Sequence, residues 1–490
     1  MALTIHQKPL YDIVHSGEKI IFTAKDVSAA TSFVKVKYIA RVYVAKLASD
    51  LGTSSSLSAT SLVATLKTNP NSSGVGIFDL SPILDNYVHP DYEGGGAYSF
   101  ATPTVFSTYK TVGSNISPHP LHLIDNFASN QNSAIFFRVV FNMEYATALT
   151  NPVEETSSYK TTDDYLLFNG ILDNEDILKE SNGDYGYNLS YNNLILNDAQ
   201  AKFLTNAPTK QYIRENDFMT LGFFNMLYPG STGGVPTDYT SGTASATGPA
   251  VKYVKIQYYY NGTTTGSAIN TNVSSGSIYQ AWQSDSVTKL QYFGCGTANQ
   301  IGDGSSLPAN WDYYTVIAYD DSDAACSQTY SFYKQTDDCK GYETIRLAWL
   351  NKFGVWDYYN FTKLSKRTFS KQSVTFTKQD GTWNKDKFEI SGYKGGSRVY
   401  KNSAKEKLTI NTDYITEEEG VWLEELFLSN DVFIINQSST DYTNQGLIRK
   451  YIDPVIISGE EHIRKTKAND SLIQYTFEIS KSKDRKIHRS

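Results

Sequence analysis

The chain has 490 residues, of which charged residues make up only 19%, and its net charge at neutral pH is −7. This weak negative charge argues against a nucleic-acid surface as the main function. Tyrosine is abundant, with 36 residues, while methionine is scarce, with four. Together with many Ser, Thr, Asn and Gly residues, this composition favours strands and turns. We therefore expect a mainly β protein of several antiparallel β-sandwich domains with few short helices.

The N-terminal residues MALTIHQKPLYDIVHS contain no basic stretch followed by an apolar one, so no secretory signal is predicted. No apolar run is long enough to cross a bilayer, and we expect no membrane span. The three cysteines, Cys295, Cys326 and Cys339, lack the CxxC spacing of a zinc site. Free thiols in a reducing cytoplasm are the expected state, with a three-cysteine metal site as the weaker alternative.

The first region, residues 1–150, is predicted to be an N-terminal β-sandwich. Its residues 33–44 alternate between apolar and basic side chains, which predicts a half-buried strand, and 134–145 predict a second strong strand. Ser81 as the N-cap and Pro82 at the first helical position predict a short helix. A Gly/Ser/Pro-rich excursion at 92–120 interrupts this domain.

Two further β-rich regions are predicted, at 151–250 and 251–361. The earlier one ends in a low-complexity loop, 229–250, which lacks apolar periodicity and is expected to be mobile. In the later one, predicted to be a third β-sandwich, residues 253–260 alternate strictly. An Asn-Gly pair at 261–262 follows them and predicts a β-hairpin.

The sequence RLAWLNKFGVWDYYNF at 346–361 has the highest density of aromatic residues. It predicts two strands joined by a turn at Gly354, which can adopt a positive φ. Aromatic residues on both strand faces favour packing on both sides. A hydrophobic core is the first interpretation, with a subunit or domain interface and a ligand cradle as alternatives. The candidate interface or core aromatics are Trp349, Phe353, Trp356, Tyr358, Tyr359, Phe361 and, from the last region, Trp422.

The last region, 362–490, is predicted to be a sandwich-plus-helix domain with a basic tail at 481–489. Thr416 and Glu419 form a capping box, which predicts the clearest helix of the chain. Its apolar stripe is expected to cover the alternating strand at 473–479. The stripe consists of Trp422, Leu423, Leu426 and Phe427.

No nucleotide-binding, metalloprotease or serine-hydrolase motif is present. His119 and His122 have H-x-x-H spacing, but the prolines around them favour a loop over a metal site. The carboxylates of Asp320, Asp321 and Asp323 could bind calcium, although a solvated turn is the simpler interpretation. We therefore predict no enzyme activity, no catalytic residue, no cofactor and no metal.

Four stretches of the chain, in this order, resemble virion structural proteins of tailed bacteriophages. The last region is similar in outline to tail-tube and distal-tail domains, families that form rings around the tail axis. The resemblance implies a structural component of a tail ring, collar or baseplate, located in the virion tail and made in the host cytoplasm. Its implied partners are copies of itself in a ring and other phage tail proteins, and no functional residue is carried over. The four stretches are LTIHQKPLYDIVHSGEKIIF (3–22), FLTNAPTKQYIRENDFMTLGFF (203–224), RLAWLNKFGVWDYYNF (346–361) and ITEEEGVWLEELFLSNDVFII (415–435).

Two alternative functions remain open at this point. One is a receptor-binding module that recognises a host surface glycan, which exposed aromatic pairs beside loop carboxylates would favour. The other is a glycan-degrading tail enzyme, because the two carboxylates that such a reaction needs can come from anywhere in a sequence. Release of reducing sugar would indicate the enzyme.

Overall fold

The computed structural model shows a mainly β protein with several sheets and few helices, as the composition predicts. The described residues form two compact units. Unit 1 holds those up to 335 together with Leu350–Asp357, and unit 2 holds 336–349 and those from Tyr358 onward. The described residues are 3–9, 13–17, 19–45, 48–53, 56–57, 61–90, 127–129, 133–172, 196, 198–224, 251–272, 290–302, 306–320, 322–336, 341–390, 392–435, 452–459 and 473–483.

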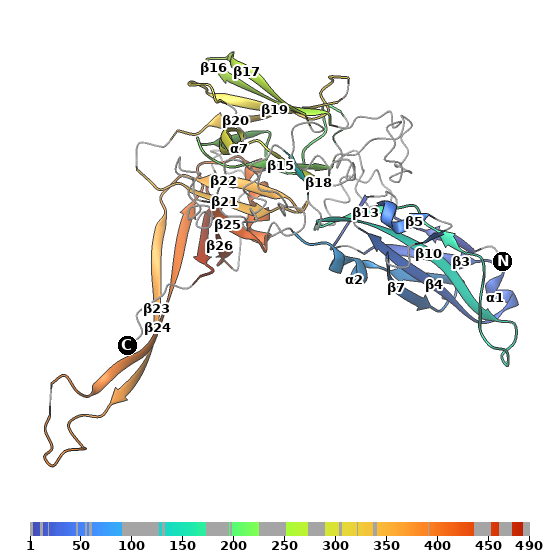
Figure 1. The fold of residues 1–490 in the computed structure, drawn as a ribbon, viewed down its shortest axis with the longest axis horizontal. Coiled ribbons are helices and arrows are strands. Elements are labelled where there is room, and N and C mark those ends of the chain that lie inside the picture. Colours follow the sequence, from blue (N-terminus) through green and yellow to red (C-terminus); the bar gives the residue numbers. More distant parts are fainter. Residues whose placement is uncertain are drawn as a thin grey trace. The chain divides into compact units, whose positions relative to one another are not determined.

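Unit 1 begins with a β-sandwich made of two sheets (Figure 1). The smaller sheet is antiparallel and has the strand order β1 (Leu3–Gln7), β3 (Ile21–Asp26), β8 (Val75–Asp79). The larger sheet has the strand order β2 (Ile13–His15), β13 (Tyr165–Phe168), β10 (Ala134–Ala146), β4 (Val34–Ala45), β7 (Leu62–Thr68). Two short strands, β11 (Glu154–Glu155) and β12 (Lys160–Thr161), also pair with β10. Among the described strands of this sandwich, only β2 and β13 run parallel to each other.

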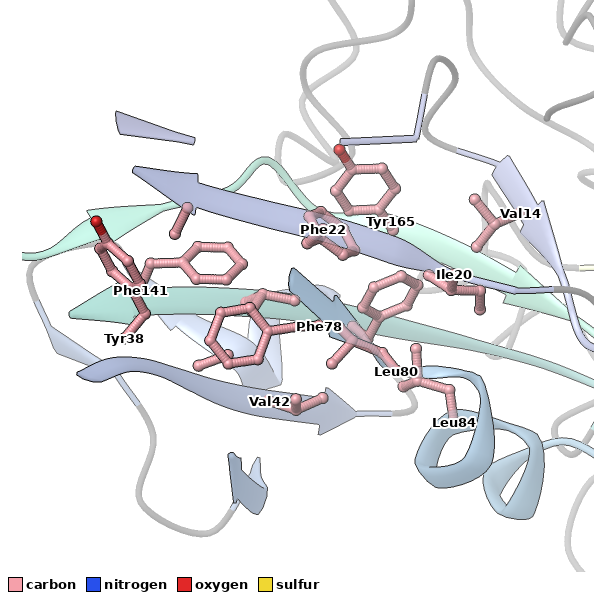
Figure 2. Packing of buried hydrophobic residues seen from close by; sticks show 14 of the residues in the cluster. Val14, Ile20, Phe22, Tyr38, Val42, Phe78, Leu80, Leu84, Phe141 and Tyr165 are labelled. Atoms are coloured by element: carbon pink, nitrogen blue, oxygen red, sulfur yellow. The ribbon is translucent and has the colours of Figure 1, made fainter. Parts of the chain in front are cut away.

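The core of this sandwich lies between the two sheets, as Figure 2 shows. Phe22 of the smaller sheet meets Tyr165 of the larger sheet edge to face, with ring centroids 5.5 Å apart. Phe78 and Phe141 make a second ring contact between the sheets, with centroids 5.6 Å apart and the rings tilted by 54°. These contacts follow from alternation, because every second residue of each strand points to the same side.

Short helices and turns connect these strands. They are α1 (Ala29–Ser32), the 3₁₀ helix η1 (Ala48–Leu51), the strand pair β5 (Gly52–Thr53) and β6 (Ser56–Leu57), α2 (Ser81–Leu84) and the 3₁₀ helix η3 (Asp85–Tyr87). The predicted cap of α2 is wrong by one residue, since Leu80 is the N-cap and Ser81 is already helical. The reason is that Asp79 accepts hydrogen bonds from the Ser81 backbone N and hydroxyl.

The described residues of unit 1 also form two further sheets and one further α-helix. One sheet has the order β15 (Thr220–Phe224), β18 (Leu290–Gly294), β9 (Phe127–Ser129). The other has the order β14 (Lys210–Ile213), β20 (Tyr330–Lys334), β19 (Tyr313–Tyr319), β16 (Tyr253–Tyr260), β17 (Thr263–Asn272), and the helix is α7 (Thr297–Gly302). The predicted hairpin between β16 and β17 is confirmed, because Asn261 and Gly262 both have positive φ.

Unit 2 contains one large sheet and the helix α8 (Glu417–Leu428). The sheet order is β22 (Trp356–Phe361), β21 (Ile345–Leu350), β25 (Val432–Ile435), β26 (Ile452–Ile457), β27 (Thr476–Lys481), β24 (Gly396–Asn411), β23 (Lys366–Lys378). The predicted capping box is confirmed: Thr416 Oγ1 accepts from Glu419 N at 3.2 Å, and Thr416 N donates to Glu419 Oε2 at 2.8 Å. The predicted alternation at 473–479 is also confirmed, with Ile473, Tyr475, Phe477 and Ile479 buried.

The expected domain boundaries fall inside sheets. A boundary at 150 would separate β10 from its partners β11, β12 and β13. The region 151–250 forms no sheet of its own among the described residues, because its strands join three different sheets. A boundary at 361 would separate β21 from β25, with which it pairs. A sequence pattern predicts a strand but not its pairing partners. Domain boundaries placed between predicted strands therefore divide sheets whose strands are far apart in the sequence.

Several sequence predictions concern residues outside the described ones. They are the excursion at 92–120 with His119 and His122, the loop at 229–250, Cys339, Asp321 and the basic tail beyond 483.

The packing of α8 predicts very different costs for two substitutions. Trp422 is buried against Trp349, with ring centroids 5.1 Å apart, so Trp422→Ala should lower the free energy of unfolding by about 3–5 kcal/mol. Thr416→Ala removes only the cap and should cost about 0.5–2 kcal/mol. Denaturant titration of the full chain, followed by tryptophan fluorescence, measures both. An equal stability of wild type and Trp422→Ala would refute the core assignment.

Candidate interaction surfaces

The aromatic residues of the 346–361 stretch are mostly core residues. Trp349, Trp356, Tyr358 and Phe361 are buried, while Tyr359 and Phe353 are half-buried. In unit 2, Trp422 of α8 packs against Trp349 and lies 6.0 Å from the ring of Tyr359. Trp349 and Trp422 are therefore core residues, because both are buried and their rings pack against each other.

The turn of this hairpin is fixed by Asn351 and Gly354. Asn351 Oδ1 accepts from the backbone N of Phe353 at 3.0 Å, and Asn351 Nδ2 donates to Leu204 O at 2.9 Å. Gly354 has φ +75° and lies directly on the backbone of Asn169, so it has no room for a side chain. The sequence predicted the positive φ but not this close approach.

A buried polar pair, which the sequence did not single out, accompanies the aromatic residues in unit 2. Arg346 is 2% exposed, and its Nη1 donates to Asn360 Oδ1 at 2.9 Å. The guanidinium also lies over the ring of Tyr358, 5.1 Å from its centroid. Such buried pairs give directional hydrogen bonds that fix the alignment of two strands.

The largest exposed feature of unit 2 is a two-stranded ribbon, residues 366–411, which we call the arm (Figure 1). Every residue of β23 is exposed, and only Lys407–Asn411 at the base of β24 pairs with a third strand, β27. At that base, Arg367 binds Glu343 at 2.5 Å and Glu406 at 3.3 Å. The sequence patterns did not predict the arm.

The end of the arm is an ordered turn with exposed aromatic side chains, which we call the tip (379–395). Thr382 is buried there; its hydroxyl donates to Lys387 O and accepts from Glu389 N, both at 3.0 Å. Trp383 meets Phe388 edge to face at 5.4 Å and is still 69% exposed. Ile390 and Tyr393 are 78% and 75% exposed. Large apolar side chains gathered at one exposed end typically mark an interaction site.

The arm also differs in charge from the rest of the chain. Residues 366–411 contain eleven Lys and Arg against four Asp and Glu, a net charge of +7. Because the whole chain carries −7, its other residues together carry −14. The positive charge of this segment can be counted from the sequence. Without knowledge of the strand pairing, however, the segment resembles an ordinary polar one.

Two of the three aspartates considered as calcium ligands are described, and Asp320 and Asp323 lie in a turn of unit 1. Asp320 Oδ1 accepts from the backbone N of Ser322 at 2.8 Å and of Ala324 at 2.9 Å. Desolvation alone would raise the pKa of Asp320, but these hydrogen bonds lower it below its ordinary value. Asp323 has φ +61° and lies 3.7 Å from Lys252 Nζ. The Asp320 carboxylate is thus used by the turn itself, and that of Asp323 faces a lysine.

Two of the three cysteines are described, and neither Cys295 nor Cys326 forms a disulfide, as predicted; both are buried. Burial, with a smaller effect of Asp320, raises the pKa of the Cys326 thiol to about 12. Among the described residues, no three His, Cys, Asp or Glu side chains come together as metal ligands. Within the same residues, no helix has the length and apolar character needed to cross a membrane.

Comparison with known proteins identifies no relative. No protein-family model matches the chain, and no curated protein matches it. Among solved structures, the native conformation of E. coli alpha-2-macroglobulin is similar at 7% sequence identity and a TM-score of 0.18. That match covers 84% of this chain but 22% of the macroglobulin, so the chain spans about a fifth of that protein. A likeness this weak carries no argument about function.

Two glycines with the same φ provide a test of the hairpin turn. Gly262→Ala places its methyl group in open space and should cost only the left-handed backbone penalty, about 1–2 kcal/mol. Gly354→Ala pays the same penalty and also overlaps the Asn169 carbonyl, so it should cost about 1–3 kcal/mol more. Chemical denaturation of both variants measures the difference. Equal losses would show that the close approach is not rigid.

Proposed function

We propose that this protein is a structural subunit of a bacteriophage tail. In this proposal it assembles with copies of itself and with other tail proteins into a ring, collar or baseplate. It has no catalytic role. The arm is the observation that supports the proposal, and the resemblance of four sequence stretches to tailed-phage virion proteins supports the location.

The arm has the physical properties of an element that binds a neighbour. An isolated two-stranded ribbon is marginally stable in water, because neither face buries apolar surface. The arm nevertheless carries Phe369, Val374, Phe376 and Tyr400 on exposed positions, besides the aromatic tip. Contact with another subunit would bury these side chains and stabilise the ribbon.

The charge of the arm favours a second copy of the chain as that neighbour. A segment of +7 is attracted to a body of −14, and such complementarity both speeds association and fixes its orientation. The many lysines of the arm also oppose uncontrolled pairing between its free strand edges. A contact of arm to body between identical subunits is head-to-tail, and such contacts close into rings when the rotation permits.

Substitutions at the tip test the assembly role. The triple variant Trp383→Ser, Ile390→Ser, Tyr393→Ser should remain folded but stay monomeric where the wild type forms oligomers, because the tip loses its apolar contact. The matched control is Val27→Ser, Leu149→Ser, Ile171→Ser, three side chains of unit 1 with 76%, 74% and 64% exposure. Mass photometry over a concentration series measures the oligomeric state, and circular dichroism checks the fold.

Three outcomes of this experiment are decisive. Loss of oligomers only in the tip variant supports assembly through the arm. Unchanged oligomers in the tip variant, or a wild type that is monomeric at every concentration, would refute it. Immunogold electron microscopy of virions tests the location separately, since gold at the capsid or an absence of label would contradict a tail protein.

A further inference from the structure

A second exposed surface lies in unit 1, on the sheet β14-β20-β19-β16-β17. Along β16, Val254, Ile256 and Tyr258 are buried, whereas the residues between them are half-buried. The strands β19 and β20 alternate in the same way. Strand register therefore defines the side of this sheet opposite the core, which we call the tyrosine face. Its tyrosines are Tyr212, Tyr253, Tyr259, Tyr313, Tyr319 and Tyr333.

Pairing aligns the tyrosines of this face in two rows across the strands. In the first row, Tyr212 pairs with Tyr333, Tyr333 with Tyr313, and Tyr313 with Tyr259. The ring centroids of Tyr313 lie 4.9 Å from Tyr333 and 4.7 Å from Tyr259, at interplanar angles of 23° and 6°.

The second row lies six residues further along β16. There Tyr253 stacks on Tyr319 with centroids 5.0 Å apart and an interplanar angle of 7°. At about 3.4 Å per residue, the two rows are roughly 20 Å apart.

The positions between the rows hold shorter polar side chains, two lysines and the half-buried Ile317, which pairs with Lys255. By register, Ser331, Thr315 and Gln257 follow the first row, and Lys210 stands at the end of their line. Lys210 Nζ lies 4.6 Å from the ring centroid of Tyr333. Lys255 Nζ lies 5.9 Å from that of Tyr319, in the second row. Neither lysine has a carboxylate within ion-pair distance in the part of the chain that the structure describes.

Fold stability explains only part of this arrangement. Cross-strand aromatic pairs stabilise a sheet by roughly 0.2–1 kcal/mol each. That role requires the rings, over which the two ammonium groups also lie, and the side chain of Tyr253 interacts with Asp323. It requires no hydroxyl group in the first row, where phenylalanine would stack equally well, yet all four positions of that row are tyrosine.

The stacking also restricts what this face can bind. Where the tyrosines are stacked, from Tyr333 through Tyr313 to Tyr259 and between Tyr253 and Tyr319, they cover one another's faces and present ring edges and hydroxyl groups. Tyr212 is tilted by 46° against Tyr333 and is 51% exposed. Nucleic-acid bases need open aromatic faces for stacking, and single-stranded nucleic acid is therefore disfavoured. Phenol, hydroxyl and amide groups instead donate to and accept from a ligand with many hydroxyl groups. The two ammonium groups favour a ligand that also carries negative charge.

We propose that the tyrosine face binds an acidic polysaccharide. Its sugar hydroxyls hydrogen-bond to the tyrosine rows and to Ser331, Thr315 and Gln257, while its carboxylates pair with Lys210 and Lys255. This site is separate from the arm, and the proposal does not depend on assembly.

Calorimetric titration of the full chain with defined probes tests the site. The probes are polygalacturonate and alginate as acidic polysaccharides, dextran as a neutral one, and a single-stranded DNA oligonucleotide. We expect binding of the acidic polysaccharides in preference to dextran and DNA. The double variant Lys210→Gln, Lys255→Gln should weaken that binding by at least about tenfold. Its control is Lys252→Gln, a lysine that already faces Asp323 and should not matter.

A second set of variants separates binding from stability. Tyr259→Phe, Tyr313→Phe and Tyr333→Phe together keep the stacked row but remove its hydroxyls, so binding should fall while the melting temperature changes little. The control is Tyr393→Phe with Tyr400→Phe on the arm. Equal binding of dextran, stronger binding of DNA, absence of binding to both acidic probes at millimolar concentration, or binding unaffected by both variant sets would overturn the proposal. A change of oligomeric state in these variants without any loss of polysaccharide binding would assign the face to subunit contact instead.

Discussion

Strand register is the constraint on which the rest of this structure depends. In an antiparallel pair, side chains directly opposite each other share one side of the sheet, so a shift by one residue would exchange the two sides. In unit 1, the register of β16 against β19 puts Tyr258 and Tyr314 in the core and Tyr259 and Tyr313 outside. The same pairing thus creates a buried aromatic layer and an exposed one, and neither can change without the other.

How much of this could be read from the sequence depends on how local each signal is. The alternation at 253–260 and the capping box at Thr416 involve neighbouring residues, and the structure matches both. Strand pairing is not local: β13 joins β2 across about 150 residues, and β21 joins β25 across more than 80. No pattern within one segment encodes such a partner, which is why the domain boundaries at 150 and 361 cut through sheets.

The same distinction between local and non-local signals explains which candidate sites the sequence could reveal. The dense aromatic run at 346–361 was one candidate interface, but its Trp349 and Trp356 side chains are buried. The two exposed surfaces, the arm and the tyrosine face, instead come from segments with no distinctive local sequence pattern. In the arm, both faces of the ribbon are exposed, so Trp383 and Phe376 have no apolar periodicity to reveal them. On the tyrosine face, the rows exist only once four separate strands have paired.

The arm has a further consequence for how this chain reaches its final structure. On the tip side of Lys407, the two strands have only each other as strand partners among the described residues, so they gain little burial to offset the entropy of ordering. The base is held differently, since Arg367 binds two carboxylates and β24 pairs with β27 there. Order in the isolated chain should therefore decrease from the base toward the tip. In the proposed assembly, a neighbouring subunit would contact the apolar tip, which is the end of the arm with the least support, so binding and ordering of the arm would be a single step.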